Sequence, residues 1–384
     1  MENFAADEPT DARLPSDSSA ITPFDRAMMQ RCLELARRAL GKTAPNPLVG
    51  AVVVQDGEIV GEGFHPGAGS PHAEVFALQA AGAKARGATI YVNLEPCNHY
   101  GRTPPCSEAL IAAGVAKVVV GMVDPNPLVA GGGIAKLRQH GIETIVGVAE
   151  ADCQRLNEAF SHRILSHQPF GILKYAMTLD GKIATTTGHS AWITSVEARN
   201  EVHQWRAASD AVIVGGNTVR HDNPHLTSHQ AEGRNPLRVV MSRTLNLPSE
   251  ARLWETSVAP TLVLTETGVN PDFHLMLVKK GVEVVAIDPL TPAKVMEYLY
   301  SRGFLSVLWE CGGTLAARAI AEGTVQKVLA FIAPKIVGGA NAPSPVGDLG
   351  LGQMNEAIAL ERVSWRTVGS DCLLEGYLPH FGDR

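Results

Sequence analysis

The chain has 384 residues, of which 45% are hydrophobic and 19% charged, and its 33 basic and 39 acidic side chains give a formal net charge of −6. This length exceeds what one hydrophobic core usually supports, so two domains are expected. The absence of a basic excess argues against a nucleic-acid polymer as the main partner, and no apolar run approaches the roughly 20 residues that span a bilayer.

Residues 1–24 are polar and mildly acidic, without the basic start and apolar middle of a secretory signal or the basic character of a transit peptide. They are predicted to form a disordered tail. The six cysteines are too sparse for a disulfide scaffold in a chain of this length. This composition favours a reducing, cytoplasmic location.

Residues 25–169 show the pattern of an α/β domain. Helical spacing over 25–40 is followed by two β-rich runs joined by Asp56-Gly57, a strong hairpin signal. Helical and strand-like segments then alternate as far as a helix over 152–165. This alternation predicts a sheet with parallel strands and helices on both faces.

Residues 170–384 begin a second alternating series, which predicts a second α/β domain. A strand-like run over 171–181 leads to a helix from residue 196, whose start resembles a capping box formed by Thr194 and Glu197. Strands follow near 210, 237, 261 and 282, and the last alternating segment is a strand that starts near residue 327.

A set of three residue types in the first domain indicates a metal site. His72 stands at the start of a predicted helix, and Cys97 and Cys106 each follow a strand or begin a helix. One imidazole and two thiolates give zinc three protein ligands and leave the fourth tetrahedral position for water, as in catalytic sites. Glu74, two residues after the histidine, is placed to move protons to and from that water. A chance H-x-E motif beside two unrelated cysteines is the alternative interpretation.

The spacing of the cysteines departs from the general zinc-deaminase pattern, which is H-x-E followed by P-C-x-x-C. Eight residues separate Cys97 from Cys106 instead of two. A loop that bulges outward over 98–105 accommodates the difference.

Four segments of the first domain resemble the deaminase half of the bifunctional RibD family of riboflavin biosynthesis, in which this insertion is normal: PNPLVGAVVV, PHAEVFAL, LEPCNHYGRTPPCSEALI and VDPNPLVAGGGI. The resemblance implies a cytidine-deaminase-like three-layer αβα fold. It also implies deamination of 2,5-diamino-6-ribosylamino-4(3H)-pyrimidinone 5′-phosphate, with His72, Cys97 and Cys106 as zinc ligands and Glu74 as the catalytic acid and base. Asn46, His99 and Arg102 are implied substrate contacts, although a turn residue and a solvated loop are the alternatives.

The second domain carries a weaker signal of its own. Cys311-Gly312-Gly313-Thr314 ends a strand and opens a helix, where glycines let the backbone approach a ligand and the helix N-terminus favours phosphate. A simple tight turn explains these residues equally well.

Four segments of this domain resemble the RibD reductase, whose fold is similar to dihydrofolate reductase: LKYAMTLDGKIATTTGHSAWITS, DAVIVGGNTVRHDNPHLT, LWECGGTLA and IAPKIVGG. The resemblance implies hydride transfer from NADPH to the ribose C1′, which opens the sugar to a ribityl chain. The implied NADPH contacts are Ala176, Trp192, Thr218, Asp222, Gly312, Gly313, Thr314, Leu315, Ala316 and Ala317. The implied substrate contacts are Lys174, Ser190, Thr194, Arg206, Leu226 and Glu310.

Two positions depart from the family pattern. His229 stands where the family usually has an arginine, and a neutral imidazole lacks the bidentate fork that binds phosphate. We still count His229 as a substrate contact, with Arg234 as a candidate substitute. Ser242-Arg243 replaces a common Asp-Ser, and Arg243 is a candidate for holding the 2′-phosphate of NADPH.

Three other interpretations stay open on the sequence alone. One is a nucleoside or base deaminase with an unrelated C-terminal domain, and another is an active deaminase whose reductase has reduced or lost activity. The third is a zinc-stabilised binding module, which requires a fourth protein ligand. The expected partner is a small phosphorylated pyrimidine, without nucleic acid or membrane, and the resemblance implies a homo-oligomer.

Overall fold

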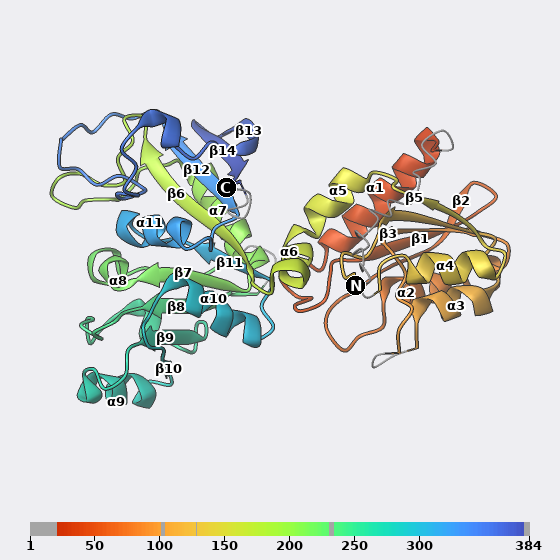
Figure 1. Cartoon of the computed structure of the whole chain (residues 1–384), viewed down its shortest axis with the longest axis horizontal. Coiled ribbons are helices and arrows are strands. Elements are labelled where there is room, and N and C mark those ends of the chain that lie inside the picture. Colours follow the sequence, from red (N-terminus) through yellow and green to blue (C-terminus); the bar gives the residue numbers. More distant parts are fainter. Residues whose placement is uncertain (1–20, 101–103, 128, 230–233, 380–384) are drawn as a thin grey trace, which may run out of the picture. The chain divides into compact units, whose positions relative to one another are not determined.

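The computed structural model describes residues 21–100, 104–127, 129–229 and 234–379, which form two compact units (Figure 1). The first unit contains the chain as far as Arg38, then Val49–His65 and Pro71–Leu156; the second contains Ala39–Leu48, Pro66–Ser70 and the chain from Asn157 onward. The predicted tail lies mostly outside the described residues. Within the described residues, no helix combines the length and the apolar character needed to cross a membrane.

The first unit is built on a five-stranded sheet with the strand order β2-β1-β3-β4-β5. Strands β3, β4 and β5 are parallel, whereas β1 pairs antiparallel with both β2 and β3. The predicted hairpin is confirmed: Asp56 and Gly57 connect β1 to β2 with positive φ angles of 51° and 81°, as in a two-residue turn. The strands are β1 (Gly50–Gln55), β2 (Glu58–Phe64), β3 (Thr89–Leu94), β4 (Lys117–Met122) and β5 (Glu143–Val146).

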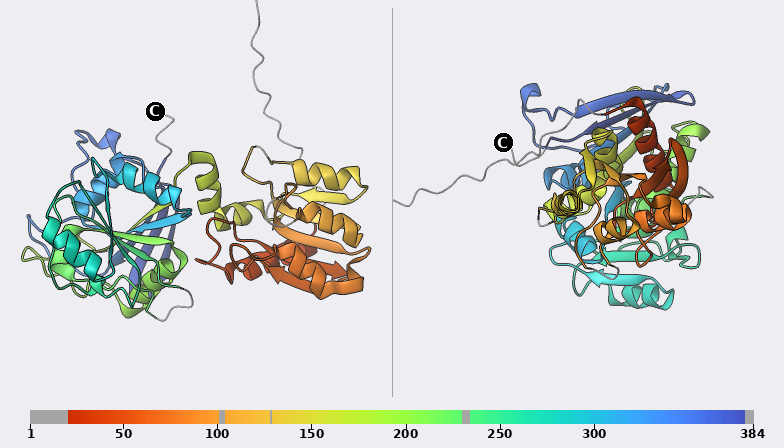
Figure 2. Two further views of the ribbon diagram at one scale, coloured as in Figure 1. Left: turned by 90° about the horizontal axis from the view of Figure 1, so that it is seen from below. Right: turned by 90° about the vertical axis from the view of Figure 1, so that its right-hand side faces the viewer.

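Helices cover both faces of this sheet and make three layers, as predicted (Figures 1 and 2). Helices α1 and α5 pack together on one face, while α2, α3 and α4 bury small and branched side chains on the other. Helix α1 begins at Pro23, two residues before the predicted start, because Thr22 and Asp25 form a capping box. The helices are α1 (Pro23–Arg37), α2 (Ala73–Ala81), α3 (Cys106–Ala113), α4 (Gly132–Gln139) and α5 (Glu150–Leu156).

The second unit is built on a nine-stranded sheet with the order β10-β9-β8-β7-β11-β6-β12-β14-β13. The strands from β10 to β12 are parallel, and the C-terminal hairpin β13–β14 adds two antiparallel strands. The strands are β6 (Phe170–Thr178), β7 (Ala211–Gly215), β8 (Leu237–Met241), β9 (Thr261–Thr265), β10 (Glu283–Ala286), β11 (Ser306–Trp309), β12 (Lys327–Ala333), β13 (Glu361–Val368) and β14 (Asp371–Tyr377).

Two apolar cores lie on the two faces of this sheet. One core includes side chains of α7, α8 and α9, and the other includes side chains of α10 and α11. Helix α6 packs beside β6. The helices are α6 (Glu158–Ser166), α7 (Val196–Ala208), α8 (Gly216–Asp222), α9 (Pro271–Lys279), α10 (Pro292–Ser301) and α11 (Gly313–Ala321).

Two details of the second unit differ from the sequence prediction. The predicted capping box at Thr194 is wrong by one residue: Ser195 is the N-cap of α7 and its hydroxyl accepts from the Ala198 N–H at 3.2 Å. The hairpin β13–β14 was not predicted. Seven of the eight β13 side chains are exposed, so this edge strand lacks the alternation of buried and exposed residues that marks a strand in a sequence.

A candidate zinc site and a candidate nucleotide pocket

The three predicted metal ligands come together at the edge of the first sheet where β3 ends. His72 is the N-cap residue of α2, Cys106 is the first residue of α3, and Cys97 follows β3. His72 Nδ1 lies 3.2 Å from Cys106 Sγ and 3.5 Å from Cys97 Sγ, and all three ligand atoms lie within 4.8 Å of one another. Tetrahedral zinc with bonds of about 2.0–2.3 Å places its ligands at about 3.5–3.8 Å from one another.

The electrostatics of the cluster suit a metal. Hydrogen bonding from the Cys106 thiol, together with His72 and the Cys106 N–H, lowers the pKa of Cys97 to about 4. Burial raises the pKa of Glu74, a residue that is only 3% exposed. Its Oε2 atom has no hydrogen-bond partner among the described residues. A buried acceptor without a partner, beside two sulfurs and a nitrogen, is what a metal-bound water would satisfy.

Among the described residues the cluster contains three ligand groups and no fourth histidine, cysteine or carboxylate. A structural zinc site is normally closed by four protein ligands, whereas a catalytic site keeps one position open. The donor set therefore fits catalytic zinc and disfavours the interpretation as a zinc-stabilised binding module.

Glu95, which the sequence did not single out, lies two residues before the zinc ligand Cys97 and binds the backbone at the start of α4 and after β4. Its carboxylate is buried and accepts four backbone N–H groups, from Asp124, Gly131, Gly133 and Ile134, at 2.9–3.2 Å. A Cβ on Gly133 would lie 2.0 Å from the Pro96 carbonyl oxygen, so only glycine permits this approach. Two features of the sequence could have indicated the role of Glu95. They are its position directly before Pro96-Cys97 and the run of three glycines downstream.

The predicted substrate contacts of the first half have different outcomes. His99 is exposed in the loop after Cys97. Arg102 lies outside the described residues. Asn46 is half-buried in a turn, where its N–H donates to the Thr43 carbonyl at 2.8 Å, and it belongs to the segment grouped with the second unit. The roles of these three residues stay predictions.

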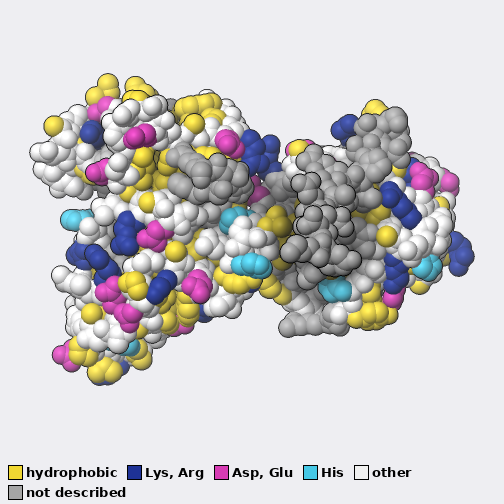
Figure 3. Space-filling view, in the orientation of Figure 1, with side chains coloured by type: hydrophobic (Ala, Val, Ile, Leu, Met, Phe, Trp, Pro, Cys, Tyr) yellow, Lys and Arg dark blue, Asp and Glu magenta, His cyan; other side chains and the backbone are white. Residues whose placement is uncertain are grey.

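The second unit contains a cavity of about 580 Å³ at the carboxyl ends of its parallel strands. Its walls come from the turn after β7, the residues after β8, the turn between β11 and α11, and the segment after β6. Lysine and arginine side chains gather over the α8 and α11 region in Figure 3. Predicted residues that line the cavity are Ser190, Thr218, Asp222, Arg243, Gly312, Gly313, Thr314 and Leu315.

Four predicted cofactor contacts do not line this cavity. Ala316 and Ala317 are both buried on α11, and Trp192 is 69% exposed, with the Arg199 guanidinium 4.4 Å from its ring centre. Ala176 packs beside the core. Residues that line the cavity but were not predicted include Ile183, Asn217, Arg220, Ser242, Thr244 and Arg318. Arg318 could have been predicted as a lining residue, because it lies one helical turn after Thr314 and so on the same face of α11.

Three predicted substrate contacts form a buried ion cluster near the carboxyl end of β11. Glu310 accepts from Arg206 Nε at 2.6 Å through Oε1 and from Arg206 Nη2 at 2.9 Å through Oε2, and Lys174 Nζ donates to the same Oε2 at 3.4 Å. Burial alone would raise the pKa of Glu310, but the charges of Arg206 and Lys174 lower it to about 2. Burial lowers the pKa of Lys174, and the charge of Glu310 opposes that shift. With both cations protonated, two positive charges share one carboxylate and the cluster carries a net positive charge.

Histidines surround this cluster. Arg206 Nη1 lies 3.4 Å from His203 Nδ1, and the rings of His203 and His229 are 4.4 Å apart at their centres. Burial lowers the pKa of His203 to about 4 and also lowers that of His229, with Arg206 adding to both effects. Both imidazoles are therefore neutral near pH 7.

The other predicted contacts lie on the loops of the same unit. Thr194 is buried immediately before the N-cap of α7, and the buried Leu226 adopts a positive φ of 53°. The Ser190 hydroxyl donates to Asp222 at 2.9 Å, which joins a predicted substrate contact to a predicted cofactor contact.

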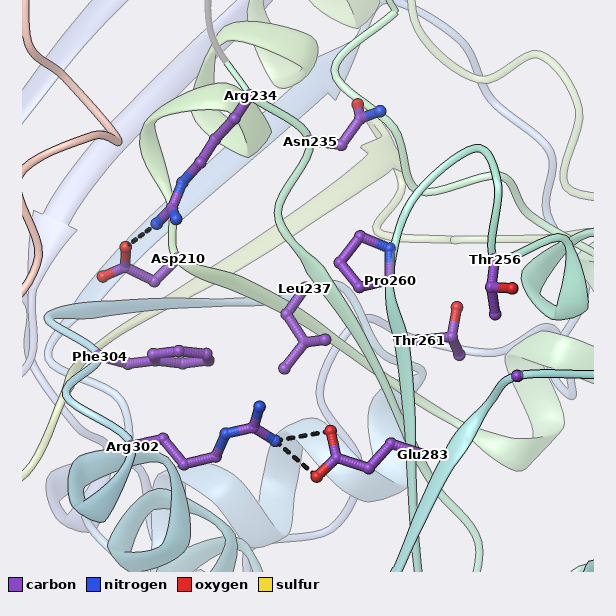
Figure 4. Close-up of a pocket in the computed structure, with 11 residues that line it drawn as sticks. Asp210, Arg234, Asn235, Leu237, Thr256, Pro260, Thr261, Glu283, Arg302 and Phe304 are labelled. Atoms are coloured by element: carbon purple, nitrogen blue, oxygen red, sulfur yellow. Dashed lines mark hydrogen bonds and ion pairs between the residues drawn. The ribbon is translucent and has the colours of Figure 1, made fainter. Parts of the chain in front are cut away.

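Arg234 does not replace the missing arginine. It points to Asp210 and forms an ion pair with it, in a separate cavity of about 480 Å³ (Figure 4). Leu237, Thr261 and Glu283, the first residues of β8, β9 and β10, also line this cavity. It therefore lies at the amino ends of the parallel strands, the edge opposite Glu310.

Comparisons with known proteins cover both halves of the chain. Residues 22–122 match the zinc-binding region of cytidine and deoxycytidylate deaminases, and residues 169–374 match the RibD C-terminal domain. The riboflavin biosynthesis protein RibD of Synechocystis is 63% identical over 354 residues, which are 92% of this chain and 96% of that protein.

Two solved structures are similar over 93% of this chain and 99% of their own, each with a TM-score of 0.82. They are RibD of Acinetobacter baumannii, at 38% identity, and a protein of Thermotoga maritima, at 39% identity, named a diaminohydroxyphosphoribosylaminopyrimidine deaminase and 5-amino-6-(5-phosphoribosylamino)uracil reductase. These matches run through both units, which disfavours an unrelated C-terminal domain. The chain therefore belongs to the RibD family and is a bifunctional enzyme of riboflavin biosynthesis, a zinc-dependent deaminase joined to an NADPH-dependent reductase.

Proposed function

We propose that the first unit deaminates 2,5-diamino-6-ribosylamino-4(3H)-pyrimidinone 5′-phosphate and that the second reduces the ribosyl group of the deaminated product to ribityl. The observation that carries the first step is the cluster of His72, Cys97 and Cys106 beside the buried Glu74 carboxyl. The name of the Thermotoga relative, which specifies both reactions, supports the substrate assignment.

In the deaminase unit, His72, Cys97 and Cys106 would hold zinc. Zinc in such a site lowers the pKa of bound water to about 7 and so supplies a nucleophile at neutral pH. Glu74 would take a proton from the attacking water and pass it to the departing amine. The raised pKa of Glu74 brings its carboxyl closer to the working pH, which favours transfer in both directions.

In the reductase unit, the cavity bounded by Gly312, Gly313 and Thr314 would hold NADPH, which supplies the hydride. Helix α11 begins there without a side-chain cap, and its Leu315 N–H donates to the Gly312 carbonyl. The N–H groups of Gly313 and Thr314 at the helix start would be the donors to a diphosphate. The cluster of Lys174, Arg206 and Glu310 retains a net positive charge suited to an anionic substrate. The substrate site of the reductase is proposed to include Ser190, Thr194, Leu226 and His229. The substrate site of the deaminase is proposed to include Asn46, His99 and Arg102.

The remaining assignments are also proposals. We place the two catalytic domains at residues 25–169 and 170–384. The contacts to the cofactor are proposed to include Ala176, Trp192, Ala316 and Ala317. We also propose that the enzyme is cytoplasmic and forms a homo-oligomer. The six cysteines are free thiols, which is consistent with a reducing compartment.

A two-step turnover assay tests the proposed function. The purified chain is given the diaminopyrimidinone phosphate with and without NADPH, and products are separated by chromatography and mass. We expect the deaminated uracil alone without nucleotide, and the ribityl product only when NADPH is added. Turnover of cytidine or guanine in place of this substrate, or no second product, contradicts the proposal.

A further inference from the structure

The segment over 190–194 connects the cavity of about 580 Å³ to helix α7 and lies outside the helices and strands. It begins at Ser190, which lines the cavity, and ends at the buried Thr194, directly before the N-cap of α7. Between them, Trp192 is largely exposed. These three residues are proposed contacts to the cofactor or the substrate, so the backbone of this segment sets the distances among them.

Two cations bind three consecutive carbonyl groups of this segment. Lys335 Nζ donates to the Trp192 carbonyl at 2.8 Å and to the Ile193 carbonyl at 2.7 Å. Arg199 Nη1 donates to the Thr194 carbonyl at 2.7 Å, and its guanidinium lies over the Trp192 ring in a cation–π contact. An ammonium group has three donors and no acceptor, so one lysine can bridge two carbonyls. Hydrogen bonds from charged donors are stronger than those between neutral groups.

The sheet places Lys335 beside this segment. Strands β6 and β12 are parallel neighbours, so the chain leaves both at the same edge. There the Lys335 carbonyl accepts from the Leu179 N–H at 2.8 Å, which ties the residues after β12 to those after β6. The Asp180 carboxylate adds to this tie by accepting from the N–H groups of Val337 and Gly338 at 3.2 and 2.7 Å. The lysine therefore extends from backbone that is itself held in place.

We propose that Lys335 and Arg199 are positioning residues of the reductase, which hold the segment over 190–194 in the conformation that binds the cofactor and the substrate. This inference rests on the proposed function, in which Ser190, Trp192 and Thr194 contact the ligands. Neither cation belongs to the lining of the cavity, so each acts through the segment. A segment that is already ordered has less conformational entropy to lose when a ligand binds.

Steady-state kinetics of the reduction test this role, with NADPH and the deaminated substrate each varied in turn. In Lys335→Met, both KM values are expected to rise about 5- to 50-fold, because ligand binding then has to order the segment. A contribution to stability alone would instead reduce the amount of active protein, and with it the apparent kcat, at unchanged KM. Lys335→Arg keeps several donors for the two carbonyls and is expected to restore most of the affinity.

Two further variants make the test specific. Arg199→Met removes the donor to the Thr194 carbonyl and is expected to raise the same two KM values. Lys280→Met is the matched control: this lysine also donates to a backbone carbonyl, that of Ser249 at 3.3 Å, but it lies at the end of α9, away from the segment. Its KM values are expected to equal those of the wild-type protein. The deamination rate of the same molecules and circular dichroism verify that each variant is folded.

The outcomes separate this inference from the function on which it rests. If the wild-type protein does not reduce the deaminated substrate with NADPH, the proposed function fails and the positioning role fails with it. If the wild-type protein is active but Lys335→Met and Arg199→Met keep the wild-type KM values, only the positioning role is wrong. A lower kcat at unchanged KM in both variants also overturns it.

Discussion

Arg206 and Glu310 form a two-point ion pair, with Arg206 Nε and Nη2 lying 2.6 and 2.9 Å from the two carboxylate oxygens. The pair joins α7 to the end of β11, and the side chains of Arg206 and Glu310 are only 13% and 9% exposed. Lys174 on β6 contacts the same carboxylate. Two buried cations thus share one buried anion.

Glu310→Gln is predicted to destabilise the second unit strongly, because Arg206 and Lys174 then lose their counter-charge. Breaking a buried pair by removing one partner costs about 3–5 kcal/mol. Denaturant unfolding followed by circular dichroism measures the change. Glu283→Gln, which removes a carboxylate 45% exposed beside Arg302, is the control and is expected to cost about 0–1 kcal/mol. Equal effects in the two variants contradict the prediction.

Glu74→Gln is predicted to keep one zinc per chain and lose deamination by a factor of about 10²–10⁴, because an amide cannot transfer protons. Metal analysis and turnover of the diaminopyrimidinone phosphate measure the two properties. The control is internal: reduction of the deaminated substrate by the same molecules is expected to be unchanged. Deamination near the wild-type rate rules out the proton-transfer role.

Glu95→Gln is predicted to loosen the segment over 124–134. One carboxylate oxygen becomes an NH₂ group that faces two backbone N–H donors, and an unsatisfied buried group costs about 1–3 kcal/mol. Hydrogen exchange of peptides covering this segment is expected to rise. Glu58→Gln, a change at an exposed residue of β2, is expected to leave it unchanged. Unaltered exchange in Glu95→Gln shows that the carboxylate does not hold the loop.

His203 is predicted to make the second unit sensitive to acid. Because its folded pKa is about 4, below the usual value of about 6.5, the unfolded chain binds more protons between these limits. The free energy of unfolding therefore decreases as the pH falls from 6.5 to 4. In His203→Gln this decrease is expected to be smaller, as measured by denaturant unfolding at each pH. Parallel wild-type and variant curves contradict the prediction.

The zinc ligands could be predicted from the sequence because their chemistry depends on residue type and on nearness to a helix start or strand end. His72, Glu74 and Cys106 all stand in the first turn of a helix or directly before it. The outward loop between the cysteines was inferred from spacing alone, and the structure brings both sulfurs together. Local pattern was sufficient for this site.

The reductase site depends on strand order, which no local pattern specifies. Gly215, Ser242 and Gly312 meet in one cavity because β8, β7 and β11 are neighbours in the sheet although they are far apart in the chain. Arg234 lies five residues after His229 in the sequence, yet β8 begins just after it, so its side chain is at the opposite edge of the strands. The closeness of Arg234 to His229 in the sequence therefore does not place their side chains in the same site.

The zinc ligands are distributed over three chain segments: the start of α2, the loop after β3 and the start of α3. A bound ion therefore cross-links these segments, and its binding free energy becomes part of the folding free energy of the first unit. Chelation is therefore expected to lower the melting temperature of that unit and to leave the transition of the second unit unchanged.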